Sequence, residues 1–357
     1  MLSSYLQGLL AVTLAFSLPH SAAAAADNAA DKPATAWPAR DWKTAKPASQ
    51  GLSAAAVARV GQWLQQHGSK TGLMVRHGRI VGEWYFGGAD RTTQLLVYST
   101  TKSFSSTATG MAIADGKLTL DSTVGQFLPD VQPTEKKQIT VGQILSMTTG
   151  LHNNKKLDRI PDLFAYALLE APLDHRPGEK WDYNNTGLSL LTPLFRAATG
   201  QSIDQFLDAR VFRPIGITAA DWSWDRNADQ PLPYSGLHIT ARALARFGLL
   251  VLRDGRWQKR QIVPADWLAA AARPSQSLNK NYGYLWWNNN EGKWPGVPPD
   301  AFAAMGKFEN DMLIVPSLDL IVIRQVGEVT GEEAKFNIGE LFRLAVEAVE
   351  DSPASAK

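Results

Sequence analysis

Residues 98–116 read YSTTKSFSSTATGMAIADG, and this stretch decides how the rest of the chain is interpreted. Its small residues predict a helix from Ser99 to Ala114 that packs closely against its neighbours in the middle of the protein. Gly116 suits the position just after the end of that helix. Because Ser99 and Lys102 are three residues apart, we expect their side chains on the same face of the helix.

The pairing of Ser99 with Lys102 points to a catalytic group. A serine hydroxyl becomes a nucleophile at neutral pH only when a base accepts its proton, and a desolvated lysine can be that base. The alternative is that Ser99 is a plain N-cap. The same spacing recurs at Ser277 and Lys280, but in a polar loop after Pro274. We therefore predict Ser99 as the acylated nucleophile and Lys102 as its activator.

A second pair of polar residues lies in the stretch PGEKWDYNNTG at 177–187, which predicts a turn, an extended piece and a helix start. Tyr183 and Asn185 are two residues apart, so in an extended piece they point the same way. A tyrosine beside a lysine can exchange a proton with a hydroxyl or a leaving group, and an amide can hold a substrate carbonyl. The alternative is a capping asparagine and a packed tyrosine.

The order of the predicted elements places strands at the two ends and helices in the middle. We expect, in chain order, a helix at 53–67, a hairpin at 72–86 turning at His77-Gly78, helices after capping boxes at Thr140 and Ser202, a helix at 239–253, strands at 311–315 and 318–325, and a final helix at 338–349. This order predicts an α+β fold with one antiparallel sheet built from both chain ends. We expect one catalytic unit at residues 51–357. Its sheet lobe would consist of residues 51–98 and 275–350, and its inserted, mostly helical lobe of residues 99–274.

The two motifs in this order, Ser99-x-x-Lys102 and then Tyr183-x-Asn185, resemble those of the penicillin-binding and class C β-lactamase superfamily of active-site serine hydrolases. Residues 139–151, 236–242 and 282–287 are also similar to segments of that family. The resemblance is closest to the branch of esterases and 6-aminohexanoate-dimer hydrolases. It implies a β-lactamase/transpeptidase-like fold, with helices flanking the sheet, and an acyl-enzyme mechanism that needs no cofactor and no metal.

The third motif of the family departs from its usual form of Lys or His, then Thr or Ser, then Gly. Lys70-Thr71-Gly72 precedes Ser99, so we treat it as a coincidence. Counting back from Pro316, the motif falls on Ala304-Met305-Gly306, in which the cation and the hydroxyl are missing. Without them, a substrate carboxylate loses its charge-assisted hydrogen bonds, which disfavours penicillins and D-Ala-D-Ala peptides. A neutral ester or amide is easier to accommodate.

The resemblance also implies residues that bind the substrate. Gly306 would let substrate lie against the strand, and Glu309, if it faces the cleft, would favour a cationic amine end. His238 follows a turn that the family places near the cleft, although a packed, hydrogen-bonded histidine is the alternative. The full predicted set of substrate-binding residues is Asn185, Gly306, Glu309, Asn310, Trp286 and His238. For the tryptophan, core packing is the alternative.

The bulk composition excludes several classes of function. The 357 residues, 45% hydrophobic and 20% charged, are ordinary for a globular protein. The formal net charge is +2, and Lys and Arg form no block dense enough for nucleic-acid binding. The chain has no cysteine, which excludes thiol catalysis, disulfides and cysteine-bound zinc, and its six histidines lack metal-ligand spacing. We expect a small-molecule ester or amide as partner and see no sign of an obligate protein partner.

The N-terminus reads as a targeting segment. Residues 9–18, LLAVTLAFSL, have the length of a signal-peptide core and are too short to span a bilayer. Small residues before Asp27 suit cleavage near Ala26, and residues 27–50 would then form a loose leader. No Lys or Arg precedes the apolar run, and the alternative is a disordered tail. We expect an exported, periplasmic protein without an integral membrane segment in the mature chain.

The sequence therefore predicts an exported serine hydrolase that cleaves an ester or an amide through a Ser99 acyl-enzyme. Lys102 and Tyr183 would share the proton transfers, and Tyr183 would protonate the leaving group. The oxyanion hole would be the Ser99 N–H and an N–H on the strand after Gly306. Two alternatives stay open: a cell-wall DD-peptidase or weak β-lactamase, and a non-catalytic relative that only binds its ligand.

Overall fold

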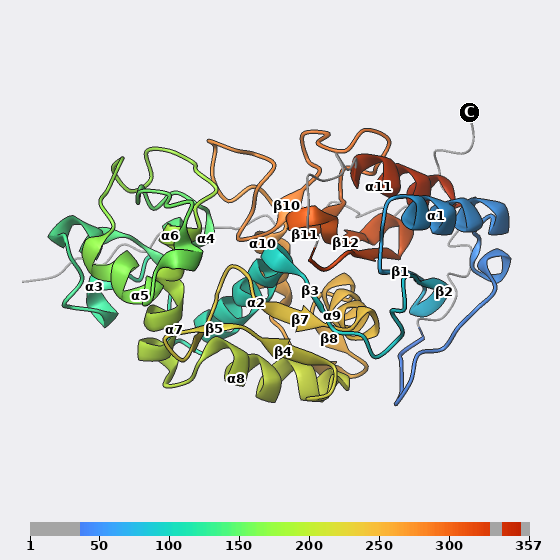
Figure 1. Ribbon diagram of the computed structural model, residues 1–357, viewed down its shortest axis with the longest axis horizontal. Coiled ribbons are helices and arrows are strands. Elements are labelled where there is room, and N and C mark those ends of the chain that lie inside the picture. Colours follow the sequence, from blue (N-terminus) through green and yellow to red (C-terminus); the bar gives the residue numbers. More distant parts are fainter. Residues whose placement is uncertain (1–35, 329–337, 351–357) are drawn as a thin grey trace, which may run out of the picture. The chain divides into compact units, whose positions relative to one another are not determined.

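A six-stranded antiparallel sheet is the central element of the fold (Figure 1). The computed structural model describes residues 36–328 and 338–350. Strands from the start of the chain lie beside strands from its end, which confirms the predicted α+β sheet built from both chain ends. The order across the sheet is β10 (Trp287–Asn288), β11 (Phe302–Gly306), β12 (Asn310–Val315), β13 (Leu320–Gln325), β1 (Thr71–Arg76) and β2 (Arg79–Tyr85).

The two faces of the sheet pack into two separate cores. Alternation along β12 sends Met312 and Ile314 to one face and Leu313 and Val315 to the other. Helices α1 (Ala54–Gln66) and α11 (Ile338–Glu347) lie side by side on the second face. Helices α2 (Thr101–Ala114) and α9 (Ala241–Leu252) belong to the core on the first face, so the predicted nucleophile helix is buried in the middle of the protein.

Local sequence explains how the first elements form. Ser53 caps α1 by accepting a hydrogen bond from the backbone N–H of Ala56 (3.3 Å). The turn between β1 and β2 has both central residues in the left-handed region, His77 at φ 51° and Gly78 at φ 72°, as two-residue hairpin turns require. A Cβ at Gly78 would lie 1.8 Å from the carbonyl oxygen of Ala36, so only glycine fits there.

The inserted lobe is mostly helical, as predicted. The capping boxes at Thr140 and Ser202 are both formed and open α4 and α8. Helix α8 is shorter than expected, because residues 208–212 continue it as a π-helix. The helices of the lobe are α3 (Val124–Phe127), α4 (Val141–Leu145), α5 (Leu163–Ala165), α6 (Asn185–Ser189), α7 (Leu191–Thr199) and α8 (Ile203–Leu207).

Short strands link the two lobes. A three-stranded sheet in the order β3, β7, β4 pairs the strand just before Ser99 with two strands near the end of the helical lobe. The remaining elements are β3 (Leu95–Leu96), β4 (Trp222–Trp224), β5 (Arg226–Asn227), β6 (Gln230–Pro231), β7 (Leu237–Ile239), β8 (Arg256–Trp257), β9 (Arg260–Gln261) and α10 (Ala265–Ala271).

The end of the expected leader is packed rather than loose. Trp42 is buried and donates its indole N–H to the carbonyl of Arg242 (3.1 Å), and Ala45 pairs with Ile80 by a backbone hydrogen bond (2.9 Å). A large aromatic side chain in this segment can be buried against α9, which outweighs its Pro- and Lys-rich composition. The expected signal peptide and residues 27–35 lie outside the described residues. No helix in the described ranges is long and apolar enough to cross a membrane.

Candidate active site

Ser99 lies in a single turn of 3-10 helix, Tyr98–Thr100, directly before α2. Tyr98 has φ 47°, in the left-handed region that a bulky L-residue rarely adopts. The backbone N–H of Val97 donates to the carbonyl of Leu237 (2.9 Å), which fixes this turn to the small sheet. Strain of this kind is found at active sites because the surrounding structure holds it in place.

Lys102 is almost fully buried, with 1% of its surface exposed. Its Nζ lies 2.8 Å from Ser99 Oγ and donates to the carbonyl of Tyr234 at 2.9 Å. Burial without a carboxylate partner lowers the pKa of Lys102 well below its usual range. The amine is therefore poised to be neutral, with its lone pair available to the Ser99 hydroxyl.

Tyr183 approaches Ser99 from the helical lobe. The Ser99 side chain is close enough to the phenol to influence its pKa, and Lys102 Nζ lies 4.8 Å from the centre of its ring. Burial raises the pKa of Tyr183 to about 12, although the Ser99 side chain opposes this rise. The phenol is thus neutral at physiological pH and is a proton donor rather than a resting phenolate.

The two adjacent asparagines after Tyr183 have different roles. Asn184 is the N-cap of α6: its Oδ1 accepts from the backbone N–H of Gly187 (2.9 Å), and its amide donates to the carbonyl of Leu151. The capping asparagine that the sequence allowed is therefore Asn184. The Oδ1 atom of Asn185 is buried and has no hydrogen-bond partner within the described residues. A buried, unpaired acceptor at this point is suited to an N–H of a substrate.

The end of β11 lies directly against the nucleophile turn. A Cβ at Gly306 would lie 2.2 Å from the carbonyl oxygen of Val97, so glycine is needed for contact between two backbone segments. This reason differs from the expected one, which was space for substrate. The N–H of Gly306 donates to Asp311 Oδ1 (2.8 Å), while Asp311 Oδ2 has no partner among the described residues. Burial raises the pKa of Asp311 well above its usual range, which favours a protonated carboxyl.

Glu309 and Asn310 are placed differently from the expectation. The Glu309 carboxylate pairs with Arg324 and accepts from the backbone N–H of Ile338 (3.0 Å). Since the carboxylate is already paired, it does not supply a free charge for a cationic substrate. The Asn310 amide donates to the carbonyl of Lys307 (2.7 Å), and its Oδ1 accepts from two backbone N–H groups, those of residues 326 and 327. Both side chains hold the turn between β11 and β12.

The tryptophan beside the site is Trp287 rather than Trp286. Trp286 is 1% exposed and packs between Phe247 and Phe302 in the core, which is the alternative that the sequence left open. Trp287 is partly exposed and stacks on Tyr183, with ring centres 5.8 Å apart. Sequence reasoning missed Trp287, although neighbouring residues in an extended segment point to opposite sides, so that only one of the two tryptophans could face the core.

His238 lies on β7 and is paired with an aspartate. Its Nε2 lies 3.1 Å from both carboxylate oxygens of Asp225. The pairing corresponds to the packed, hydrogen-bonded alternative and gives the histidine no contact with Ser99 or Lys102 in this structure. Sequence reasoning also missed Tyr234, whose backbone carbonyl accepts a hydrogen bond from Lys102. Every residue has such a carbonyl, so the sequence gives no sign of this role.

Comparison with known proteins places this geometry in a family. The sequence model of the β-lactamase family matches residues 64–326. An uncharacterized protein of Alkalihalophilus pseudofirmus is 24% identical over 292 residues, or 71% of this chain and 82% of that protein. The chain spans only 52% and 33% of two further curated relatives, from Bacillus subtilis and Staphylococcus aureus.

Solved structures share the fold. A candidate 6-aminohexanoate-dimer hydrolase from Bacillus anthracis has a TM-score of 0.67 and 19% identity over 80% of each chain. A family VIII carboxylesterase has a TM-score of 0.65 and 18% identity over 82% of this chain and 97% of its own. The family match spans well over half of the residues. The chain therefore belongs to the β-lactamase family, whose members are serine hydrolases.

Proposed function

We propose that this protein hydrolyses a neutral ester or amide through an acyl-enzyme on Ser99. The observation that carries the proposal is the contact of 2.8 Å between Lys102 Nζ and Ser99 Oγ, with the amine buried away from water. A buried amine is neutral more readily than an exposed one, so it can accept the hydroxyl proton. The esterase and amide-hydrolase descriptions of the structural neighbours support the same reaction class.

Acylation follows from the contacts around Ser99. Lys102 accepts the proton from Ser99 Oγ as the oxygen attacks the substrate carbonyl. The carbonyl of Tyr234 holds the amine in position during this transfer. Tyr183, which is neutral and lies beside Ser99, then donates its proton to the leaving alcohol or amine. Lys102 is now protonated and lies close to the Tyr183 ring. It transfers its proton to the Tyr183 phenolate, which restores both groups.

The negative charge on the tetrahedral intermediate needs backbone donors. We assign this role to the N–H of Ser99 and the N–H of Lys307, which follows Gly306. The contact of Gly306 with the carbonyl of Val97 supports this assignment, because it brings the end of β11 against the nucleophile turn. A water molecule then attacks the acyl-enzyme, with the same groups acting in the reverse order.

The substrate class follows from the residues at the third motif. Ala304 is buried and apolar, and Met305 has no charge or hydroxyl. The neighbouring cation on the sheet, Arg324, is paired with Glu309. These residues offer no free cation or hydroxyl to bind a substrate carboxylate. Their absence favours neutral esters and amides over penicillins and D-Ala-D-Ala peptides.

The proposal is tested by labelling and turnover on the same preparation. We expect a fluorophosphonate probe to label Ser99, and p-nitrophenyl butyrate or a short amide to be hydrolysed faster than nitrocefin. Labelling without turnover of any of these substrates would indicate a ligand-binding relative. Efficient nitrocefin hydrolysis with poor ester hydrolysis would instead indicate a β-lactamase or DD-peptidase.

The dependence of kcat/KM on pH should have one limb set by Lys102. A protonated Lys102 cannot accept the Ser99 proton, so activity is lost as pH falls through the lowered pKa of Lys102. The Tyr183 phenol stays protonated until its pKa of about 12, so no loss from this group is expected at neutral pH. Ester hydrolysis measured across the pH range gives the profile of the free enzyme. An unchanged acid limb in Lys102→Met would assign that limb to another group.

A matched pair of β-lactams tests whether the site lacks a group that binds a substrate carboxylate. We expect benzylpenicillin and its neutral methyl ester to acylate the protein at similar, slow rates. A charge-assisted hydrogen bond is worth about 1.5–3 kcal/mol, so an enzyme with a receiver would prefer the acid by roughly 10- to 150-fold. Acylation rates by mass spectrometry decide between these results. A strong preference for the acid would show that a cation such as Lys307 receives the carboxylate.

We also propose that the protein is exported, on the basis of the apolar run at residues 9–18 and the small residues before Asp27. Expression in a Gram-negative host followed by fractionation and N-terminal sequencing tests this proposal. We expect a periplasmic product that begins near Asp27. A cytoplasmic product that retains Met1 would contradict export.

A further inference from the structure

A second group of charged side chains lies outside the active site, around a cavity of about 520 Å³. The cavity is formed by the segment at residues 40–42, the loop at 91–92, the segment between residues 216 and 221, and the first turns of α9. Its charged lining residues are four arginines, Arg40, Arg91, Arg242 and Arg246, and two aspartates, Asp41 and Asp221. We call it the arginine cavity.

The carboxylates of the arginine cavity are already engaged. Asp221 accepts from both the backbone N–H and the hydroxyl of Thr218, each at 2.7 Å. Asp41 pairs with Arg242, which also forms a two-pronged contact with Glu83 at 2.7 and 2.8 Å. Arg242 is therefore neutralised by two carboxylates, and the remaining arginines have no ion pair with them.

Arg246 is a buried cation held only by carbonyl groups. It is 5% exposed and donates to the carbonyls of Ile215 (2.9 Å), Ala39 (3.0 Å) and Arg40 (3.1 Å). Within the described residues it forms no ion pair, and its guanidinium lies 6.0 Å from the centre of the Trp42 ring. A guanidinium stays charged in proteins, and Asp221 and Asp41 act on this charge without an ion-pair contact among the described residues.

Arg40 and Arg91 complete the positive lining from two other segments. Both are exposed, and neither forms an ion pair within the part of the chain that the structure describes. The backbone hydrogen bond from Trp42 is the main cause that lowers the pKa of Asp41, and the charges of Arg242 and Arg91 add to it. The exposed carboxylate of Asp41 thus acts on three arginines, Arg91, Arg242 and Arg246, and forms an ion pair only with Arg242 among the described residues.

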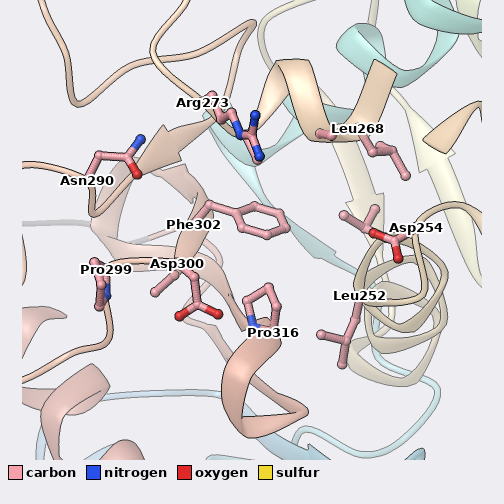
Figure 2. Close-up of a pocket in the computed structure, with 13 residues that line it drawn as sticks. Leu252, Asp254, Leu268, Arg273, Asn290, Pro299, Asp300, Phe302 and Pro316 are labelled. Atoms are coloured by element: carbon pink, nitrogen blue, oxygen red, sulfur yellow. The ribbon is translucent and has the colours of Figure 1, made fainter. Parts of the chain in front are cut away.

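A second cavity shows that this excess of positive charge is not a general property of the surface. This second cavity has a volume of about 430 Å³, and Arg273 and Phe302 are among the residues that line it (Figure 2). Its charged residues are one arginine and two aspartates, Asp254 and Asp300. The Asp300 carboxylate accepts from the backbone N–H and the hydroxyl of Ser317. The balance of charge in that cavity does not favour an anion.

We propose that the arginine cavity binds a ligand through a phosphate or diphosphate group. Guanidinium groups form paired hydrogen bonds with phosphate oxygens, and several cations around one cavity match an anion of more than one charge. The buried Arg246 provides a fixed contact, while Arg40 and Arg91 close on the anion from the surface. The cavity volume leaves room for an organic group attached to the phosphate. The source is either a soluble phosphate ester or the headgroup of an anionic lipid.

The experiment uses the full chain and two charge-matched double variants. Pyrophosphate binding is measured by calorimetry, and binding to phosphatidylglycerol vesicles by sedimentation, with phosphatidylcholine vesicles as the neutral control. Arg40→Gln with Arg91→Gln removes two contacts of the arginine cavity. Arg59→Gln with Arg260→Gln removes the same charge from exposed positions elsewhere. None of these residues lies in the catalytic machinery, so ester hydrolysis reports that each variant is folded.

We expect the Arg40/Arg91 variant to lose at least about tenfold in affinity for pyrophosphate, and the Arg59/Arg260 variant to stay within about twofold of the parent protein. Vesicle binding lost in the first variant, without pyrophosphate binding, would assign the phosphate group to a lipid headgroup. Equal loss in both variants would overturn the proposal, because it would indicate only a general effect of net charge. Binding of neither probe to the parent protein would overturn it as well.

Discussion

Replacing Ser99 by alanine is expected to lower kcat/KM for a p-nitrophenyl ester by about a thousandfold or more, with the fold retained. Removal of a nucleophile removes the acyl-enzyme route altogether, and losses of this size exceed any effect of packing. The side chain is partly exposed and its removal leaves no large cavity, so the melting temperature should change little. Steady-state kinetics and thermal unfolding on the same samples provide the two measurements.

The control for this variant is the other serine with the same spacing. Ser277→Ala removes the hydroxyl that precedes Lys280, in an exposed position. We expect full activity from this variant and full labelling by a fluorophosphonate. Retention of turnover in Ser99→Ala, together with its loss in Ser277→Ala, would show that the nucleophile had been assigned to the wrong motif.

Lys102→Ala and Tyr183→Phe are each expected to reduce turnover by roughly a hundredfold or more, and their effects should not multiply. Lys102 contacts the Ser99 hydroxyl and lies 4.8 Å from the centre of the Tyr183 ring, so we expect the two groups to form one path for the proton. Once one group is removed, the other has no partner for the transfer, and the double variant should be close to the worse single variant. The four proteins of this double-mutant cycle are compared with one ester substrate.

Two further observations make the cycle decisive. Lys102→Met keeps the length and most of the volume of the buried side chain, so an equal loss in this variant excludes a packing effect. An activated ester with a good leaving group should depend less on Tyr183, because its leaving group needs no proton. A double variant that loses the product of the two single losses would contradict a shared path.

Periodicity within one segment was enough to predict the contacts that depend on neighbouring residues. The contact of Ser99 with Lys102 follows from a spacing of three residues on one helical face. The capping box at Thr140 is likewise formed as the pattern predicts, because both of its hydrogen bonds lie within four residues. The hairpin and the strands at the C-terminal end follow from alternation and turn residues for the same reason.

The sequence did not predict which of two adjacent residues of the same type faces the active site. Trp286 and Trp287 are both aromatic, and only the position of β10 in the sheet decides which one faces the core. Asn184 and Asn185 pose the same problem at the start of α6, where a shift of one residue exchanges the cap and the free amide. Local propensity does not distinguish such neighbours, because a shift of one residue reverses the direction of both side chains.

Contacts between distant segments were also out of reach. Glu309 seemed free to face a substrate because its partner, Arg324, lies on the next strand of the sheet. The acceptor for Lys102 is a backbone carbonyl, at Tyr234, and any residue type supplies one. Asp311 reaches the N–H of Gly306 only because β11 and β12 are paired. These interactions depend on tertiary structure, which no short pattern encodes.

Side-chain hydroxyls of α2 hold the surrounding loops through hydrogen bonds to the backbone, which do not depend on the side chains of those loops. The hydroxyls of Ser103, Ser105 and Ser106 donate to the backbone carbonyls of residues 285, 233 and 284 at 3.0, 2.7 and 2.6 Å. Each acceptor belongs to the main chain, so the side chains of those loops can be exchanged while the anchoring bonds persist. Substitutions in these loops can therefore accumulate without moving the helix that carries Lys102.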